Sequence, residues 1–158
     1  MTWQWRKKKK PVSEFYRKFP KIKVKKTGSL IKKLDELFSK YIRLSALTPQ
    51  GYIICFTCRG FFTYRQIDCG HYIGREYMGT RYENRNTEPQ CHDCNRFGEG
   101  RKDVFALKLQ KKYGPGILEE LNDQRNKITQ FSVEELESMI VYYKIKVKEL
   151  ESRTVRHV

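Results

Sequence analysis

Residues 55–58, Cys-Phe-Thr-Cys, and residues 91–94, Cys-His-Asp-Cys, decide how this chain folds. Each C-x-x-C pair makes a tight turn that aims two sulfurs at one point, and four thiolates suit a tetrahedral Zn²⁺ ion. The sequence therefore predicts a structural zinc site formed by Cys55, Cys58, Cys91 and Cys94. Zinc ribbons usually separate their two pairs by about 15–20 residues, whereas residues 59–90 intervene here, so something larger than a minimal ribbon fills the interval.

The interval and the residue after it carry three side chains suited to site chemistry. His71 lies in a short strand-like run, residues 68–73, Asp-Cys-Gly-His-Tyr-Ile. Asn86 comes five residues before the second cysteine pair, and Asn95 directly follows its last cysteine. The chain therefore presents the order His, Asn, Asn around its predicted zinc site.

This order resembles the HNH, or ββα-metal, nuclease motif, in which many members have histidine where this chain has Asn95. The run from Cys55 to Gly100 is more similar to the NinG (Rap) family of phage recombination proteins, over roughly residues 30–121. More distantly, it resembles the endonuclease VII resolvases of T-even phages, where an asparagine also follows the last zinc cysteine. The resemblance implies an α+β fold, with a small zinc-stabilised HNH (ββα-metal, treble-clef-like) core and flanking α-helices.

The same resemblance implies a function. It is that of a metal-dependent, structure-specific DNA endonuclease acting on branched recombination intermediates, such as Holliday junctions and D-loops. Two cuts in a branched substrate favour a homodimer, and phage recombination proteins are expected as further partners. Two other functions fit the residues: a non-catalytic zinc-dependent nucleic-acid-binding protein, in which His71 only packs, and an HNH nuclease of the nicking or homing type.

The resemblance also gives each polar residue a role. His71 is the general base, because neutral imidazole near its ordinary pKa accepts a proton from water. Asn86 fixes the loop that orients this base, with an ordinary turn asparagine as the alternative. The side-chain oxygen of Asn95 binds a catalytic Mg²⁺ or Mn²⁺ ion, which needs at least one further hard oxygen ligand.

The acidic metal ligand is less clear, because glycine precedes the histidine. Many HNH nucleases have Asp or His at that position, where this chain and NinG-like sequences have Gly70. Asp68 is the nearest acid, but on an ideal strand it faces away from His71, so a bulge at Gly70 is expected to bring it round. Glu83 and Asp93 are the other candidates.

Cysteine usage predicts the compartment. The chain has five cysteines, so Cys69 is left over from the zinc pairs. On an ideal strand Cys69 faces the same way as His71, so the two side chains either bind a second zinc together or Cys69 is a buried free thiol. Paired metal-binding cysteines and the lack of an apolar signal or membrane-length run predict a reducing cytoplasm, that of the bacterial host, and no membrane.

Charge points to a polyanionic partner. Thirty-three Lys and Arg against eighteen Asp and Glu leave a net charge of +15, which attracts nucleic acid without choosing between DNA, RNA and anionic lipid. Arginine dominates the central segment, and its planar fork suits fixed phosphate contacts. We expect DNA contacts, with a solvated surface as the alternative for each, from Arg75, Arg81, Arg96, Arg101 and Lys102.

The chain divides into three predicted parts: a basic flexible arm over 1–28, the zinc nuclease domain with its preceding helix over 29–114, and a helical segment over 115–158 with possible dimerisation. Apolar residues recurring every three or four positions predict helices over 30–44, 103–113 and 132–152, with a short helix from 117. The stripe on the last long helix is typical of a core or of a dimer seam: Leu136, Met139, Ile140, Tyr143, Val147 and Leu150.

Strands are predicted at three places. Residues 52–54 form a short strand, and residues 61–67 pair with the run around His71 as a hairpin or irregular pair. Residues 74–90 are polar and irregular, so they are expected to form a loop that lies against the substrate.

Overall fold

The computed structural model describes residues 27–155, so the predicted arm over 1–28 lies almost wholly outside the described residues. The helices are α1 (Thr27–Ser45), α2 (Met78–Arg81), α3 (Lys102–Tyr113), α4 (Ile117–Asn126) and α5 (Val133–Val155). The strands are β1 (Ile53–Ile54), β2 (Phe61–Phe62), β3 (Ile67–His71) and β4 (Thr87–Cys91). Two 3-10 turns, η2 (Tyr64–Gln66) and η3 (Asn84–Asn86), and one π-helical turn, η4 (Asp93–Phe97), complete a mixed α+β fold, as predicted.

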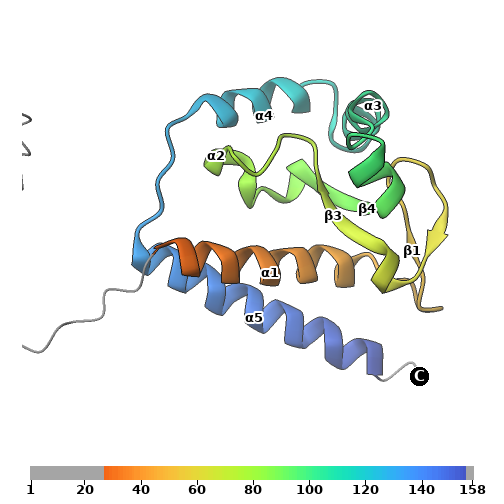
Figure 1. The fold of residues 1–158 in the computed structure, drawn as a ribbon, viewed down its shortest axis with the longest axis horizontal. Helices are drawn as coiled ribbons and strands as arrows, with labels where there is room; N and C mark the ends of the chain where they lie inside the picture. Colours follow the sequence, from red (N-terminus) through yellow and green to blue (C-terminus); the bar gives the residue numbers. More distant parts are fainter. Residues whose placement is uncertain (1–26, 156–158) are drawn as a thin grey trace, which may run out of the picture.

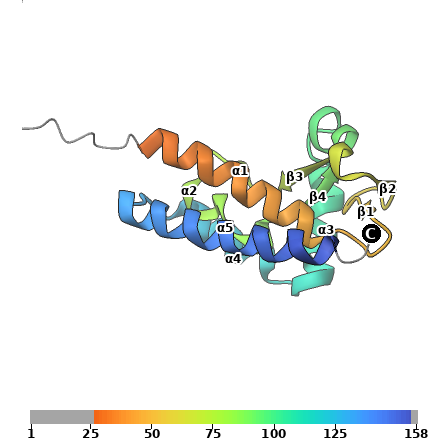
Figure 2. The ribbon, with the colours of Figure 1, turned by 90° about the horizontal axis from the view of Figure 1, so that it is seen from below.

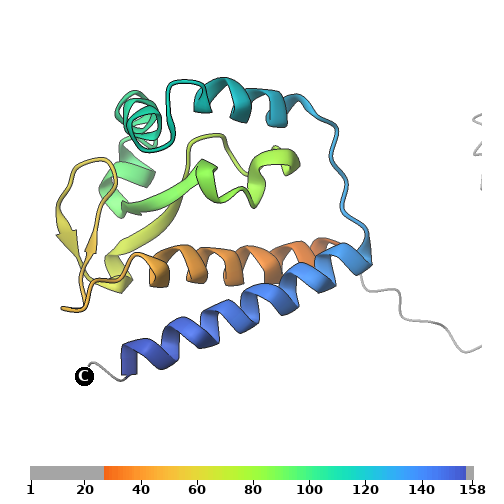
Figure 3. The same ribbon diagram turned by 180° about the vertical axis from the view of Figure 1, so that it is seen from behind.

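The elements form three layers. The pair β3–β4 and the short α2 lie between a layer made by α1 and α5 and a layer made by α3 and α4 (Figures 1 and 3). The α3–α4 layer has its own small core of Phe105, Leu109, Ile117 and Leu121. The sheet is therefore covered on both sides, which protects polar groups along it from water.

Helices α1 and α5 form the base of the molecule and lie side by side (Figure 2). Leu34 and Phe38 are four residues apart on α1, so they share one face, and both are buried against Leu136 and Tyr143 of α5. The ring of Phe38 meets that of Tyr143 edge to face at 5.2 Å between centroids. The apolar stripe predicted on the C-terminal helix is thus a core stripe within the chain.

Ser132 and Glu135 form a capping box at the start of α5. The backbone N–H of Glu135 donates to Ser132 Oγ at 3.1 Å, and the backbone N–H of Ser132 donates to Glu135 Oε2 at 2.7 Å. Each side chain satisfies a backbone group that the first helical turn leaves unpaired.

Strand pairing differs from the sequence-based prediction. Residues 61–62 pair with 53–54, and β3 pairs antiparallel with β4, from Ile67 opposite Cys91 to His71 opposite Thr87. The predicted pairing of 61–67 with the run around His71 is therefore wrong.

The predicted loop over 74–90 is also wrong, because its last four residues belong to β4 and are all buried. Their polar side chains have fixed partners: Gln90 Nε2 donates to Thr57 Oγ1 at 3.2 Å and to the carbonyl of Gly100 at 2.9 Å. Glu88 accepts a hydrogen bond from Lys112 at 2.5 Å. Polarity suggested a surface loop, whereas these bonds allow burial.

Candidate functional site

The four paired cysteines come together where β1 and β4 end. Their sulfur atoms all lie within 4.8 Å of one another, and the sulfurs of Cys58 and Cys91 are 3.9 Å apart. Tetrahedral zinc with Zn–S bonds of about 2.3 Å implies sulfurs roughly 3.8 Å apart. The predicted four-cysteine site can therefore hold a metal ion such as zinc.

The electrostatics of this four-cysteine cluster favour a cation. Burial raises the pKa of Cys55, but hydrogen bonds from the Thr57 hydroxyl and from the backbone of Cys58 and Cys91 lower it to about 6. Burial, together with neighbouring Cys94 and Cys55, raises the pKa of Cys91 to about 12. One thiolate is stable here, and further thiolates require positive charge among them, which a bound metal supplies.

The second cysteine pair positions the residues that follow it. Cys94 lies in the π-helical turn η4, whose end is tied down by the N–H of Gly98 donating to Asp93 at 2.7 Å and that of Gly100 donating to Cys94 at 3.0 Å. The amide nitrogen of Asn95 donates to Asp68 Oδ2 at 3.1 Å. A single turn after β4 therefore brings Asn95 against β3.

A pocket of about 400 Å³ lies beside this turn. Asp68 and His71 of β3 line it together with Asn95, and Ser39 lines it from α1. The bulge expected at Gly70 is absent, because β3 pairs residue for residue with β4. Within residues 27–155 β3 pairs only with β4, and residues from both faces of β3, Asp68 as well as His71, line the pocket.

The imidazole of His71 is held in one tautomer. Its Nε2 lies 3.1 Å from the carbonyl oxygen of Arg81, which can only accept, so Nε2 carries the proton and Nδ1 keeps a lone pair. Burial, helped by the positive charges of Arg75 and Lys102, lowers the pKa of His71 below its ordinary value. The ring is therefore neutral near pH 7 and able to accept a proton.

Asn86 is fully buried and acts as a clamp on the segment that follows β3. Its Oδ1 accepts from the backbone N–H of Ile73 at 2.8 Å, and its Nδ2 donates to the carbonyls of Ile73 and Thr80 at 2.9 and 3.0 Å. This segment also leads to Arg81, whose carbonyl orients His71. Asn86 therefore acts on His71 indirectly, by fixing the backbone that carries the Arg81 carbonyl, and it does not line the pocket.

The carboxylate of Asp68 is ionised and hydrogen-bonded. Burial raises its pKa, but hydrogen bonds from Arg96 and Asn95 lower it below the ordinary value for aspartate. Arg96 makes a two-pronged contact, Nε to Oδ2 and Nη2 to Oδ1, each 2.8 Å, and Nε2 of His92 lies 3.5 Å from Oδ1.

Asp68 is the acid among the three candidates that lines the pocket. Glu83 instead accepts from the backbone N–H of Arg85 and pairs with its guanidinium, and Asp93 is exposed on η4.

Comparison with known proteins places the chain in a family. The family model described as Bacteriophage Lambda NinG protein matches residues 2–153. The chain belongs to the NinG family. It is 26% identical over 134 residues to Protein ninG of Escherichia phage 933W, covering 84% of this chain and 64% of that protein. It is 25% identical to Protein ninG of Escherichia phage lambda, covering 84% and 63%.

This NinG-family chain therefore spans just under two thirds of the length of the curated relatives it matches. No solved structure matches it. Within residues 27–155, no helix is long and apolar enough to cross a membrane.

The five predicted DNA-contacting residues of this NinG-family chain occupy different settings. Arg75 and Arg96 line the pocket, and Arg101 is exposed beside η4. Arg81 is instead committed to Asp35 of α1, with Nε and Nη2 at 2.9 and 2.5 Å from its two oxygens.

Asp35 carries no local signal in the sequence, because its partner lies 46 residues away.

Cys69 lies outside the four-cysteine cluster, is partly buried against the α1–α5 core and also lines the pocket at His71. Burial raises its pKa to about 12, so it is a protonated thiol. Of the two predictions for Cys69, the structure favours the buried free thiol over a second zinc ligand shared with His71.

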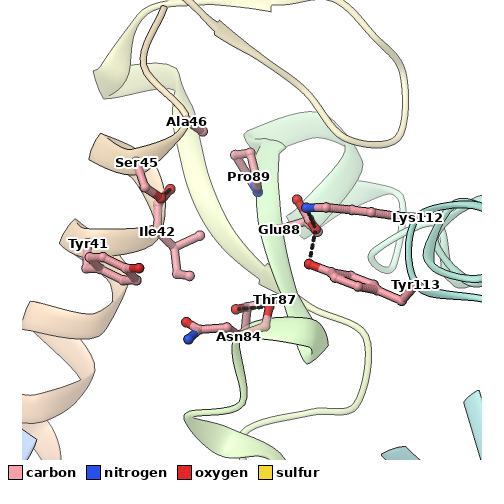
Figure 4. A pocket seen from close by; sticks show the side chains of 10 residues that line it. All are labelled: Tyr41, Ile42, Ser45, Ala46, Asn84, Thr87, Glu88, Pro89, Lys112 and Tyr113. Carbon is pink, nitrogen blue, oxygen red and sulfur yellow. Dashed lines mark hydrogen bonds and ion pairs between the residues drawn. The ribbon is translucent and has the colours of Figure 1, made fainter. Parts of the chain in front are cut away.

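A second pocket of the NinG-family chain, about 330 Å³, opens between α1 on one side and β4 and α3 on the other (Figure 4). Its one carboxylate, Glu88, already accepts from Lys112 Nζ at 2.5 Å and from the Tyr113 hydroxyl at 3.3 Å. No histidine lines it. Among the described residues, this pocket therefore has no free carboxylate or imidazole, and the pocket at His71 is the better candidate site.

Proposed function

We propose that this NinG-family protein is a metal-dependent DNA endonuclease with an HNH (ββα-metal) core, which hydrolyses phosphodiester bonds in branched DNA. One observation carries the proposal: His71, Asp68 and Asn95 meet in a single pocket beside the four-cysteine cluster. Asp68 and His71 come from β3 and Asn95 from η4, in a unit of two antiparallel strands followed by one helical turn, which is the order that the name ββα describes.

The residues of the pocket divide the work of hydrolysis. Nδ1 of His71 takes a proton from a water molecule, whose oxygen attacks phosphorus as the 3′ oxygen leaves. The carboxylate of Asp68 and Oδ1 of Asn95 are hard oxygen donors that fit Mg²⁺ or Mn²⁺. Such an ion supplies positive charge against the phosphate and the departing oxygen. Asn86 and the Arg81 carbonyl keep the imidazole in the required tautomer.

Arg96 connects metal binding with substrate binding. It now holds both oxygens of Asp68, while its own side chain is 55% exposed. When Asp68 binds an ion, Arg96 is free to turn outward to a phosphate of the DNA, where its planar fork fits. Arg75, exposed at the same pocket, is a second phosphate contact.

The branched substrate and the recombination setting come from the family resemblance. A branch has two strands to cut, so we propose a homodimer working with other phage recombination proteins in the host cytoplasm. Because α1 covers the main apolar stripe of α5, the dimer has to use another surface, such as the exposed Val141, Tyr142 and Ile145. Sedimentation that shows a monomer at all working concentrations refutes the dimer.

The proposed activity is tested with an end-labelled four-way junction beside its linear duplex, in Mg²⁺ and in Mn²⁺. We expect the wild type to cut the junction preferentially, and His71→Ala to lose about 10²–10⁴-fold in rate while still binding it. Asn95→Ala should require far more metal ion for the same rate. Asn126→Ala, an exposed asparagine at the end of α4, is the matched control and should cut normally.

Other outcomes select other functions. Tight, metal-independent binding with no cutting by any variant favours the non-catalytic zinc-dependent nucleic-acid-binding protein. Equal cutting of junction and linear duplex, or nicking of one strand only, favours an HNH enzyme of the nicking or homing type.

A further inference from the structure

A larger pocket, about 540 Å³, lies on the other side of Gly74 from the pocket at His71. Its lining residues come from the segment that follows β3 and from α3 and α4. Two tyrosines, Tyr72 and Tyr77, and two cations, Lys102 and Arg125, line it. Aromatic rings alternating with positive charges are typical of surfaces that bind nucleic acid strands.

Tyr77 and Arg125 form a preassembled pair. The guanidinium carbon of Arg125 lies 4.2 Å from the centroid of the Tyr77 ring, and its Nη2 donates to the Tyr77 hydroxyl at 2.6 Å, so the guanidinium is held against the ring and its hydroxyl. Both side chains are only partly covered. A nucleobase has two planar groups to stack on here, because bases stack on aromatic rings and on guanidinium planes alike.

Lys102 ties this pocket to the pocket at His71. Its ammonium donates to the backbone carbonyls of His71 and Tyr72 and lies 5.8 Å from the centroid of the Tyr72 ring. An ammonium has three N–H groups, so one remains for a phosphate oxygen. A DNA strand bound here can therefore place a phosphate on Lys102, whose ammonium is itself bonded to the backbone carbonyl of His71, the proposed general base.

One carboxylate, Glu76, also lines the pocket, and the other walls suit a base. Tyr72 rests on the buried ring of Phe105 at 6.0 Å between centroids, and Leu118 adds an apolar side. The amide of Asn122, on the rim, offers both a donor and an acceptor to the edge of a base. The volume lies within the range of about 300–1,000 Å³ that small-molecule sites have.

We propose that this pocket binds an unpaired nucleobase of the DNA strand that is cut at His71. The inference rests on the proposed function, since it takes DNA as the ligand and extends the same site. A base inside a duplex is stacked on both faces and cannot enter without leaving the stack, whereas an unpaired base enters at little cost. A D-loop contains an unpaired strand, and a base pair at a junction point opens more readily than one inside a duplex, so the pocket supplies a physical reason for preferring branched DNA.

The test measures DNA binding in the His71→Ala background, which prevents cutting. The probes are a forked duplex with an unpaired 2-aminopurine at the branch and a linear duplex of the same paired sequence. We expect Tyr77→Leu and Arg125→Gln each to bind the fork about tenfold more weakly, equivalent to about 1.4 kcal/mol, with little change for the duplex. The 2-aminopurine fluorescence should be quenched by the parent protein and much less by these variants.

Two further variants distinguish stacking from loss of structure. Tyr77→Phe keeps the ring, so it should bind the fork like the parent. Tyr52→Leu removes an exposed tyrosine that lies outside the pocket and outside the proposed dimer surface, so it should change nothing. Equal weakening of fork and duplex binding by Tyr77→Leu and Arg125→Gln, or no weakening at all, overturns the proposal.

This result is independent of cutting. If the wild type cuts no DNA but the pocket variants still lose fork binding, the proposed endonuclease fails and the base pocket stands. If the wild type cuts junctions and the pocket variants bind forks normally, the endonuclease stands and the base pocket fails.

Discussion

Gly70, the residue directly before His71, is the position at which a single methyl group should matter most. A Cβ built there lies 2.1 Å from Gln90 Oε1, 2.8 Å from its Cδ and 2.9 Å from its Cγ. Gln90 cannot move aside cheaply, because it is fully buried and its Nε2 is bonded to Thr57 and to the Gly100 carbonyl. Gly70→Ala therefore overpacks the sheet.

The cost of Gly70→Ala can be worked out from these contacts. Overpacking costs about 1–3 kcal/mol, and shifting Gln90 weakens two buried hydrogen bonds worth about 1 kcal/mol each. Alanine also lowers the conformational entropy of the unfolded chain relative to glycine, which offsets about 0.4–1 kcal/mol of this loss of stability. We expect a net loss of about 2 kcal/mol, which for a chain of this size lowers Tm by roughly 4–8 °C.

The assay is thermal unfolding followed by circular dichroism at saturating zinc, for Gly70→Ala, Gln90→Ala and the double variant. Removing the Gln90 side chain makes room for the methyl group. The stability lost in the double variant should therefore be smaller, by about 1 kcal/mol or more, than the sum of the losses in the two single variants. Wild-type stability for Gly70→Ala, or strict additivity in the cycle, refutes this reasoning.

Gly70→Asp, which restores the acid that many HNH nucleases have there, should be at least as unstable as Gly70→Ala and should gain no activity, since its side chain points at Gln90.

Three further predictions concern the metal cluster, the clamp and the base. Cys55→Ser should lose bound zinc, measured by elemental analysis, and unfold at a lower temperature, whereas Cys69→Ala should keep its zinc. Asn86→Ala removes the partner of both backbone groups of Ile73, whereas the Thr80 carbonyl still accepts from the N–H of Glu83; the loss should be about 2–4 kcal/mol in urea unfolding, a value that an ordinary turn asparagine would not reach. If His71 is the base, kcat/KM for cutting should fall as pH drops through its pKa, with a midpoint below the ordinary 6.5 because burial lowers that pKa; a midpoint above 7 contradicts the assignment.

The parts that sequence predicted correctly are those with local signals. A C-x-x-C pair fixes two sulfurs within four residues, so the four-cysteine cluster required only that the two pairs meet. Likewise, the apolar periodicity of residues 30–44 and 132–152 predicted α1 and α5 to within a few residues. Such patterns are set by the backbone period alone.

The missed features depend on residues that are distant in sequence. The sequence of Thr87–Cys91 resembles a loop because it lacks the alternation of apolar and polar residues that marks a half-buried strand. Gln90 finds its partners, Thr57 and Gly100, only once the chain has folded. Similarly, Asp68 reaches the pocket because η4 folds back over the edge of β3, without the bulge that an isolated strand would need.

The pairing of α1 with α5 also affects how the protein is made. α1 is synthesised before α5, and the part of its apolar face that packs on α5 is covered only when α5 arrives. At about 5–20 residues per second, the roughly 90 residues between them take on the order of 5–20 s to emerge, long enough for the zinc cluster to assemble first. For that interval the α5-facing apolar surface of α1 is exposed on each growing chain. Neighbouring ribosomes on one messenger RNA therefore hold nascent chains with identical exposed apolar surfaces close together.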